Sequence, residues 1–145
     1  MKLIEKIKNK WCKRKVTVSF KDNYINCGLP VVGLWCDNVK LNFLVDSGST
    51  INAINEEAVK YLHYTDTDLT AEVAHAGGIS SGKFIKLTLN DTKNIVEDNF
   101  MVINLSEQFA TISQKDHVLL HGIVGCRFLE TIEGKLDFKK FELTY

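Results

Sequence analysis

The chain contains 145 residues, with 18 Lys and Arg side chains against 18 Asp and Glu, so its formal net charge is zero. This length suits about one domain with a core of its own, and no disulfide is required for its stability. Seven of the basic residues and one acidic residue lie in residues 1–15, which leaves 11 basic and 17 acidic side chains in residues 16–145. An acidic domain is poorly suited to neutralise phosphates, so nucleic acid is not an expected partner.

The basic N-terminal extension, residues 1–15, precedes a single expected domain at residues 16–145. The apolar residues of the extension have the spacing of one helix face: Leu3, Ile4, Ile7 and Trp11. Such a helix could bind an anionic membrane surface. For so short a stretch we favour the alternative, an extension that frays or packs on its own domain.

The sequence shows neither the apolar core of a secretion signal nor a membrane-spanning stretch. Its four cysteines contain no Cys-x-x-Cys pair, as a redox or zinc motif would. We therefore expect reduced thiols in a cytoplasmic protein, with membrane association through residues 1–15 as the less favoured alternative.

Most of the predicted elements are short strands separated by turn residues. In chain order the strands cover residues 16–20, 30–35, 39–45, 71–76, 83–89, 100–105, 118–124, 135–138 and 141–144. A Gly-rich turn is expected at residues 77–82, between the fourth and fifth of them. Short helices are expected at residues 55–59, with Asn55 as the cap, and at residues 126–131. This pattern predicts an all-β barrel or sandwich.

One short motif points to chemistry. The apolar strand at residues 39–45 runs directly into Asp46-Ser47-Gly48, and no second Asp-Ser/Thr-Gly occurs in the 145 residues. A lone motif of this kind is usually a turn in which the aspartate binds its own backbone. A carboxylate at the end of a buried strand is costly, however, unless its charge is shared or hydrogen-bonded. The strand before it therefore favours a catalytic interpretation.

A metal site is the alternative that His117, His121 and Cys126 suggest, because His-x-x-x-His places two ligands on one face of a helix. The residues between them are rich in β-branched side chains and are broken by Gly122. Such a stretch is typical of a strand, so we expect no metal.

Three segments, in the same order, resemble those of the retropepsin-like aspartic proteases, the single-lobed family that includes the retroviral enzymes. Residues 43–50, Phe-Leu-Val-Asp-Ser-Gly-Ser-Thr, resemble the active-site signature. Gly77-Gly78-Ile79 followed by Phe84-Ile85-Lys86 resembles the flap, and Ile123-Val124-Gly125 followed by Phe128-Leu129 resembles the apolar strand and terminal helix. The resemblance covers about residues 24–145 and is most specific at the first segment.

The resemblance implies a closed β-barrel-like domain with one short C-terminal helix, acting as a symmetric homodimer without a cofactor. It implies catalytic roles for Asp46, Ser47 and Gly48, and substrate binding by Ser49, Gly77, Gly78 and Ile79. Ile123, Val124 and Gly125 would support the site. The terminal strand, residues 141–145, would contribute to the dimer interface, together with residues 16–20. Arg127 departs from the family, since many cellular members have an acidic residue there.

Peptide hydrolysis without a metal or a nucleophile needs one group that takes a proton and one that gives it. Two carboxylates that share a proton can do both, and their pKa values belong to the pair. Because each chain has a single Asp46 motif, the second carboxylate is expected from a symmetry-related copy. The Ser49 hydroxyl could donate to the ionised carboxylate, which predicts activity shifted toward acid.

The sequence thus leaves two hypotheses. The first is a homodimeric aspartic endopeptidase that acts on peptide or protein substrates. The alternative is a non-catalytic module of the same fold that dimerises or binds peptides, because a fold does not guarantee an active site.

Overall fold

The computed structural model of the protein describes residues 15–75, 77–91 and 93–145, so the helix considered within residues 1–15 lies outside the described residues. The strands are β1 (Thr17–Ser19), β2 (Val31–Cys36), β3 (Val39–Val45), β4 (Asn52–Asn55), β5 (Thr65–His75), β6 (Gly78–Asn90), β7 (Ile95–Ile103), β8 (Gly122–Val124), β9 (Lys135–Asp137) and β10 (Glu142–Thr144). The helices are α2 (Lys21–Cys27), α3 (Glu56–Val59), α4 (Ser106–Asp116) and α5 (Cys126–Ile132).

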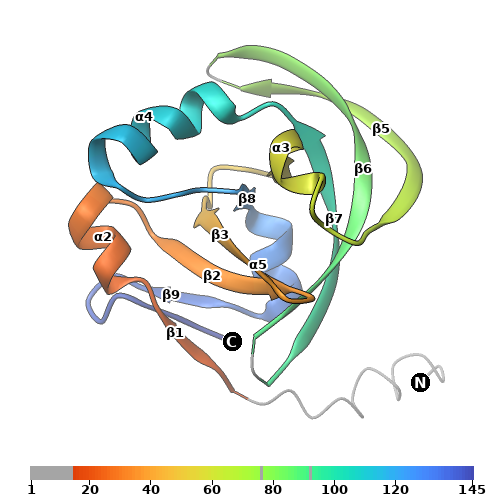
Figure 1. The fold of residues 1–145 in the computed structure, drawn as a ribbon. Coiled ribbons are helices and arrows are strands. Elements are labelled where there is room, and N and C mark those ends of the chain that lie inside the picture. The colour runs from red at the N-terminus through yellow and green to blue at the C-terminus, as the bar shows by residue number, and fades with distance from the viewer. Residues whose placement is uncertain (1–14, 76, 92) are drawn as a thin grey trace, which may run out of the picture.

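Six strands form a closed barrel in the order β2-β3-β8-β4-β7-β6, and a pairing of β2 with β6 at Trp35 and Asn90 closes the ring (Figure 1). The prediction of a mostly β, barrel-like domain is therefore confirmed. The β3–β8 and β4–β7 pairs are parallel, whereas the other pairs in the ring are antiparallel. Closure leaves no unpaired edge in the ring itself.

Side chains that alternate along the strands pack into two separate hydrophobic clusters, one inside the barrel and one outside it. On β3, Phe43 and Val45 point into the barrel and are at most 4% exposed. Leu44, between them, packs on the outer side against a second cluster that includes Phe109 of α4. Side chains of successive strand residues point to opposite faces, so β3 separates the barrel interior from the cluster beneath α4.

The structure contains more helices than the one short C-terminal helix that was expected. α5 was predicted, but the structure also contains α2 and the eleven-residue α4, and the strand predicted at residues 118–124 is reduced to β8. The sequence of α4 has few apolar residues, and its one buried side chain is Phe109. Tertiary packing rather than a strong amphipathic pattern therefore stabilises this helix.

Asn55 occupies the predicted cap position of α3, yet its side chain makes no capping hydrogen bond there. Its Oδ1 accepts a hydrogen bond from the Leu105 amide at 3.0 Å, and its Nδ2 donates to Ser106 Oγ at 3.2 Å. The side chain of Asn55 thus fixes the start of α4 instead of the start of α3.

A separate sheet has the order β1-β10-β9, with the C-terminal strand in the middle. Leu143 of β10 is paired with Val18 on one side and with Leu136 on the other. Aromatic rings of Phe20 and Tyr24 pack edge-on against Phe138 beside this sheet. Both hydrogen-bonding edges of β10 are therefore used within one chain.

The β5–β6 hairpin is longer than predicted. The Gly-rich turn expected at residues 77–82 is mostly strand, since β6 begins at Gly78 and pairs with β5 from there. The two strands curve together along the outside of the barrel, and the end of β5 and the start of β6 lie at the top of the view (Figure 1). In the parts of the chain that the structure describes, no helix has the length and apolar character needed to cross a bilayer.

Candidate active site

Asp46 lies where β3 ends, on a loop that its own neighbours hold in place. The Asp46 amide donates to the Val124 carbonyl at 3.0 Å, and the Ser49 amide donates to the Asp46 carbonyl at 3.1 Å. The carboxylate oxygen Oδ1 accepts a hydrogen bond from the Gly48 amide at 2.9 Å. Asp46 is half-buried, and Ser47 and Gly48 are exposed. A loop fixed by its backbone in this way presents the carboxylate at the surface of the barrel.

β8 brings the second predicted segment beside the first. The parallel pairing sets Leu44 opposite Ile123 and Val45 opposite Val124. Residues 123–125, almost 80 positions away in the sequence, therefore lie directly alongside the strand that ends at Asp46. The structure thus brings Ile123, Val124 and Gly125 beside the Asp46 loop.

Gly125 packs against the backbone of the Asp46 loop. A Cβ atom at this position would lie 2.5 Å from the Ser49 carbonyl oxygen and 2.6 Å from that of Ile51. Real Cβ atoms do not approach carbonyl oxygens so closely, so only glycine fits without a backbone shift. The close approach allows the next amide, that of Cys126, to donate to the Ser49 carbonyl at 2.8 Å.

Cys126 makes a second contact with the loop. Its side chain is exposed, and its Sγ lies 2.8 Å from the Ser47 carbonyl oxygen, to which the thiol donates. Backbone and side chain of this one residue thus hold the carbonyls of Ser49 and Ser47. The first turn of α5 is in this way joined to the predicted catalytic loop.

The expectation for Ser49 is wrong in one respect. Its hydroxyl donates to the Ile51 carbonyl at 2.7 Å instead of to the Asp46 carboxylate. A hydroxyl has one proton to donate, so this bond removes the contact on which the predicted acid shift rested. Ser49 instead stabilises the turn of its own loop.

The predicted flap residues lie at the end of the β5–β6 hairpin. Gly78 has φ +127°, which favours glycine, and Ile79 is 74% exposed. His75 binds both sides of the hairpin end: its Nδ1 accepts from the Gly77 amide at 3.1 Å, and its Nε2 lies 2.7 Å from Ser80 Oγ. Among the described residues, no hydrogen bond joins this end of the hairpin to the Asp46 loop.

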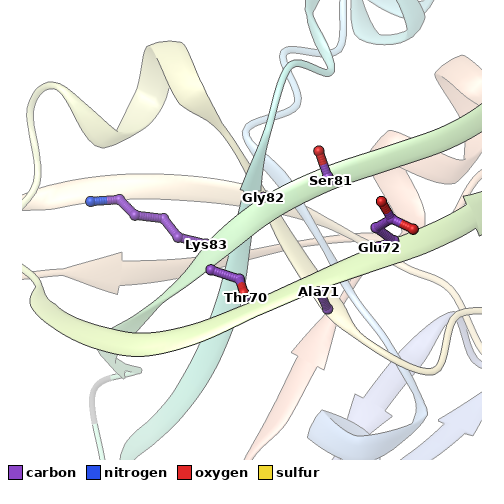
Figure 2. A pocket seen from close by; sticks show the side chains of 6 residues that line it. All are labelled: Thr70, Ala71, Glu72, Ser81, Gly82 and Lys83. Atoms are coloured by element: carbon purple, nitrogen blue, oxygen red, sulfur yellow. The ribbon is translucent and has the colours of Figure 1, made fainter.

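A shallow hollow lies on the same hairpin, between β5 and β6, lined by Thr70, Ala71, Glu72, Ser81, Gly82 and Lys83 (Figure 2). None of these residues was predicted as a site residue. A Cβ on Gly82 would lie 2.5 Å from the Val102 carbonyl oxygen, so the hairpin rests closely on β7 at this point. The hollow is therefore part of the hairpin surface and not of the Asp46 loop.

The two histidines considered as metal ligands have different structural roles. His117 is exposed and ends α4 with a left-handed backbone, whereas His121 accepts a hydrogen bond from the Asn42 amide at its Nδ1, at 2.9 Å. Burial lowers the pKa of His121, which favours the neutral ring that this bond requires. Within the described ranges no group of three or more His, Cys, Asp or Glu side chains could hold a metal ion.

Comparison with known proteins decides the family. A family model described as "Aspartyl protease" matches residues 32–128, which is more than half of the chain. The chain belongs to the aspartyl protease family. A search of curated proteins found no match.

The fold is also similar to a solved structure of this family, the crystal structure of a retropepsin-like aspartic protease from Rickettsia conorii. The two share 18% sequence identity, with 92% of this chain and 99% of that chain covered and a TM-score of 0.51. At this identity the likeness concerns the fold. Together with the family match, it supports the retropepsin-like assignment that the motifs suggested.

The residues matched by the aspartyl protease family include Asp46, the β5–β6 hairpin and Gly125, and exclude β1, β9 and β10. One polar pair that sequence reasoning missed lies inside the matched region. Asn52 is 3% exposed, and its Nδ2 donates to Asp98 Oδ2 at 3.0 Å. The sequence offered no signal for this pair, because each residue has other polar residues near it and polar character does not by itself reveal a partner.

Arg127 marks a departure from the family pattern. Its side chain is exposed on α5, one residue after Cys126, and it makes no ion pair within the described part of the chain. The local ion pair that an acidic residue would give at this position is therefore absent from the described residues.

Proposed function

We propose that this aspartyl protease is a homodimeric endopeptidase in which each copy supplies one Asp46 carboxylate. The observation that carries the proposal is Asp46 itself, half-buried at the end of β3, with its loop fixed by Val124, Gly48 and Ser49. One carboxylate cannot both take and give a proton in the same step. Because the sequence contains one such motif, the second carboxylate comes from the partner.

In the proposed mechanism the two carboxylates share one proton. The ionised Asp46 removes a proton from a water molecule, which attacks the carbonyl carbon of the peptide bond. The protonated Asp46 of the partner subunit donates a hydrogen bond to the carbonyl oxygen as negative charge develops there. Two carboxyl groups about 3 Å apart cannot both ionise, so their proximity maintains the shared proton.

The two-fold axis of this dimer passes beside Asp46, so exposed residues around Asp46 lie at the proposed interface. They are Ser47, Gly48, Thr50, Cys126 and Arg127. The exposed guanidinium of Arg127 gives this surface a positive charge, and exposed arginines are enriched at protein interfaces. This surface replaces the C-terminal strand as the central part of the proposed interface.

The C-terminal strand is not free for such a role, because β10 is already paired on both edges with β1 and β9. A strand with both edges paired cannot accept a third strand. Residues 141–145 therefore support the dimer through the stability of their own sheet. Among the described residues of this sheet, β1 and β9 each have one edge without a partner strand.

The β5–β6 hairpin is proposed to cover an extended substrate. Gly77 and Gly78 allow the hairpin end to approach a peptide backbone closely, and the exposed Ile79 offers an apolar contact. An extended peptide binds well to backbone groups at a strand edge. Closure of this hairpin would also exclude water from the reacting carbonyl.

The test compares the wild-type protein with Asp46→Asn in a mixed peptide library from about pH 3 to about pH 8, the range in which carboxyl pairs titrate. Mass spectrometry reads cleavage and sedimentation reads the dimer. We expect cleavage only by the wild type, with dimers of both proteins. Asp22→Asn, an exposed aspartate on α2, is the matched control and should cleave normally. Dimers of the wild type without cleavage at any pH would favour the non-catalytic module.

A further inference from the structure

The side chain of Asn52 forms a buried bridge behind the Asp46 loop. Its Oδ1 accepts a hydrogen bond from the Gly125 amide at 2.9 Å. Its Nδ2 donates to Asp98 Oδ2 at 3.0 Å and to the Asn99 carbonyl at 3.2 Å. The amide of Asn52 thus joins β4 to β7 on one side and to the residue after β8 on the other.

Asp98 and the Asn99 carbonyl together decide which way the Asn52 amide points, because both accept from its NH₂ group. An amide has a donor end and an acceptor end of similar shape, whereas an ionised carboxylate only accepts. The carboxylate of Asp98 is itself fixed, because its Oδ1 accepts from the Asn99 amide at 2.8 Å. Asn52 must therefore direct its NH₂ group to Asp98, which leaves its oxygen for Gly125.

The Gly125 amide is the point at which this bridge reaches the site. Gly125 lies against the carbonyls of Ser49 and Ile51 with no room for a side chain. The residues on either side of it bind the loop directly, since Val124 accepts from the Asp46 amide and Cys126 donates to Ser49. A shift of Gly125 would therefore displace the two backbone hydrogen bonds that join the Asp46 loop to Val124 and Cys126.

We propose that Asn52 is a positioning residue of the Asp46 loop and that Asp98, with the Asn99 carbonyl, holds its amide in the required orientation. The inference rests on the proposed function, because it concerns the placement of the carboxylate that is proposed to react. Neither residue contacts Asp46 in the structure. Their effect passes through the Gly125 backbone, which the Asn52 oxygen fixes from behind the loop.

The first experiment measures amide hydrogen exchange at Gly125 by NMR, relative to the amides of β2. In Asn52→Ala we expect exchange at Gly125 to accelerate at least tenfold more than in β2, because a buried hydrogen bond is worth about that factor. Asp98→Asn should accelerate it by about threefold or more, since the charge-assisted hydrogen bond to the Asn52 amide is lost and the Asn99 carbonyl alone then holds its NH₂ end. Each measured exchange rate is divided by the intrinsic exchange rate of the same amide in an unfolded chain.

The matched control is Asn55→Ala. Asn55 is also buried on β4, three positions along, but it binds Leu105 and Ser106 at the start of α4. Its loss should destabilise the protein while exchange at Gly125 changes no more than exchange in β2. An equal acceleration at Gly125 and β2 in Asn52→Ala, or a selective one in Asn55→Ala, would overturn the proposal.

A sharper test exchanges the amide and the carboxylate between positions 52 and 98. In Asn52→Asp alone, two carboxylates face each other, and Gly125 should lose protection at neutral pH because like charges repel. In the double variant N52D/D98N, the carboxylate at position 52 still accepts from Gly125, and the amide at position 98 donates to that carboxylate. The Asn99 carbonyl loses its donor in both variants, so we expect protection at Gly125 in the double variant to rise at least about tenfold above that in Asn52→Asp without reaching the wild type. Protection that stays as low as in Asn52→Asp contradicts the proposal.

Measurements of peptide cleavage test this inference and the proposed function separately. If the wild type cleaves peptides, Asp98→Asn should lower kcat about tenfold with KM within about twofold, because the reacting carboxylate is misplaced while the substrate surface is intact. The double variant should recover kcat in part. If the wild type cleaves nothing, the proposed function fails, and the exchange data alone still decide whether Asn52 and Asp98 position the loop.

Discussion

The phenol of Tyr145 donates a hydrogen bond to the carboxylate of Asp91, which joins the end of the β1-β10-β9 sheet to the connection between β6 and β7. Tyr145 is 8% exposed, and Asp91 Oδ1 also accepts from the amides of Lys93 and Asn94. One carboxylate therefore both shapes a turn of the barrel and fixes the neighbouring sheet against it.

Tyr145→Phe should lower the free energy of unfolding by about 1.5–3 kcal/mol, the usual value of a hydrogen bond to a charged group. Chemical denaturation measures this difference. Tyr61→Phe is the control, because Tyr61 is 78% exposed and should change stability by less than about 0.5 kcal/mol. Equal stability of the two variants would show that the contact with Asp91 contributes nothing.

The same contact predicts a loss of stability in alkali. Burial, and then the hydrogen bond and the charge of Asp91, raise the pKa of Tyr145. The folded protein therefore keeps the proton to higher pH than the unfolded chain, whose tyrosines titrate near about pH 10. Stability from this group is complete below about pH 10 and falls as the pH rises above it. Denaturation of the wild type and Tyr145→Phe should show a smaller alkaline loss in the variant.

Gly125→Ala should disrupt the Asp46 loop, because the added Cβ would lie 2.5 Å from the Ser49 carbonyl oxygen. We expect a loss of about 2–4 kcal/mol in the free energy of unfolding, as for strained core substitutions. Gly33→Ala is the matched control on β2, where the Cβ would meet only the flexible end of the Lys40 side chain at 2.6 Å. Similar losses in both variants would argue against a special requirement at Gly125.

Phe109→Ala should remove most of the packing between α4 and the barrel. Phe109 is 6% exposed in the cluster with Val31 and Ala53, and such truncations cost about 3–5 kcal/mol. Leu119→Ala, at a side chain that is 58% exposed, should cost less than about 0.5 kcal/mol. Thermal denaturation of both variants checks the difference, and an equally stable Phe109→Ala would show that α4 packs loosely.

Because His121 is partly buried, we expect the folded protein to lose stability in acid. Burial lowers its pKa in the folded protein, so the unfolded chain binds this proton first as the pH falls below about 6.5. Stability is complete above that pH and is lost as the pH falls through the folded pKa. His121→Asn keeps an acceptor for the Asn42 amide without a titrating group. Its unfolding free energy should therefore change less between about pH 7 and about pH 5 than that of the wild type. A parallel change in both proteins would exclude His121 as the cause.

Sequence reasoning worked best where the pattern is local. The hairpin of β2 and β3, the strand that ends at Asp46 and the helix α5 follow from alternation, turn residues and apolar spacing within a few positions. Reasoning failed for α4, whose residues have weak helical periodicity, and for the first part of the strand predicted at residues 118–124, where Leu119 and His121 bind Asn42 outside a regular ladder. In both cases burial against distant residues decides the structure.

The sequence by itself determined that Asp46-Ser47-Gly48 ends an apolar strand and that Gly125 follows another, since strand and turn preferences act between near neighbours. Only the tertiary structure decided how these segments meet, because pairing between β3 and β8 depends on residues almost 80 positions apart. The same holds for the bridge from Gly125 through Asn52 to Asp98, whose members lie 46 and 73 positions apart. A polar side chain has several partners of similar chemistry in the sequence, and packing selects among them.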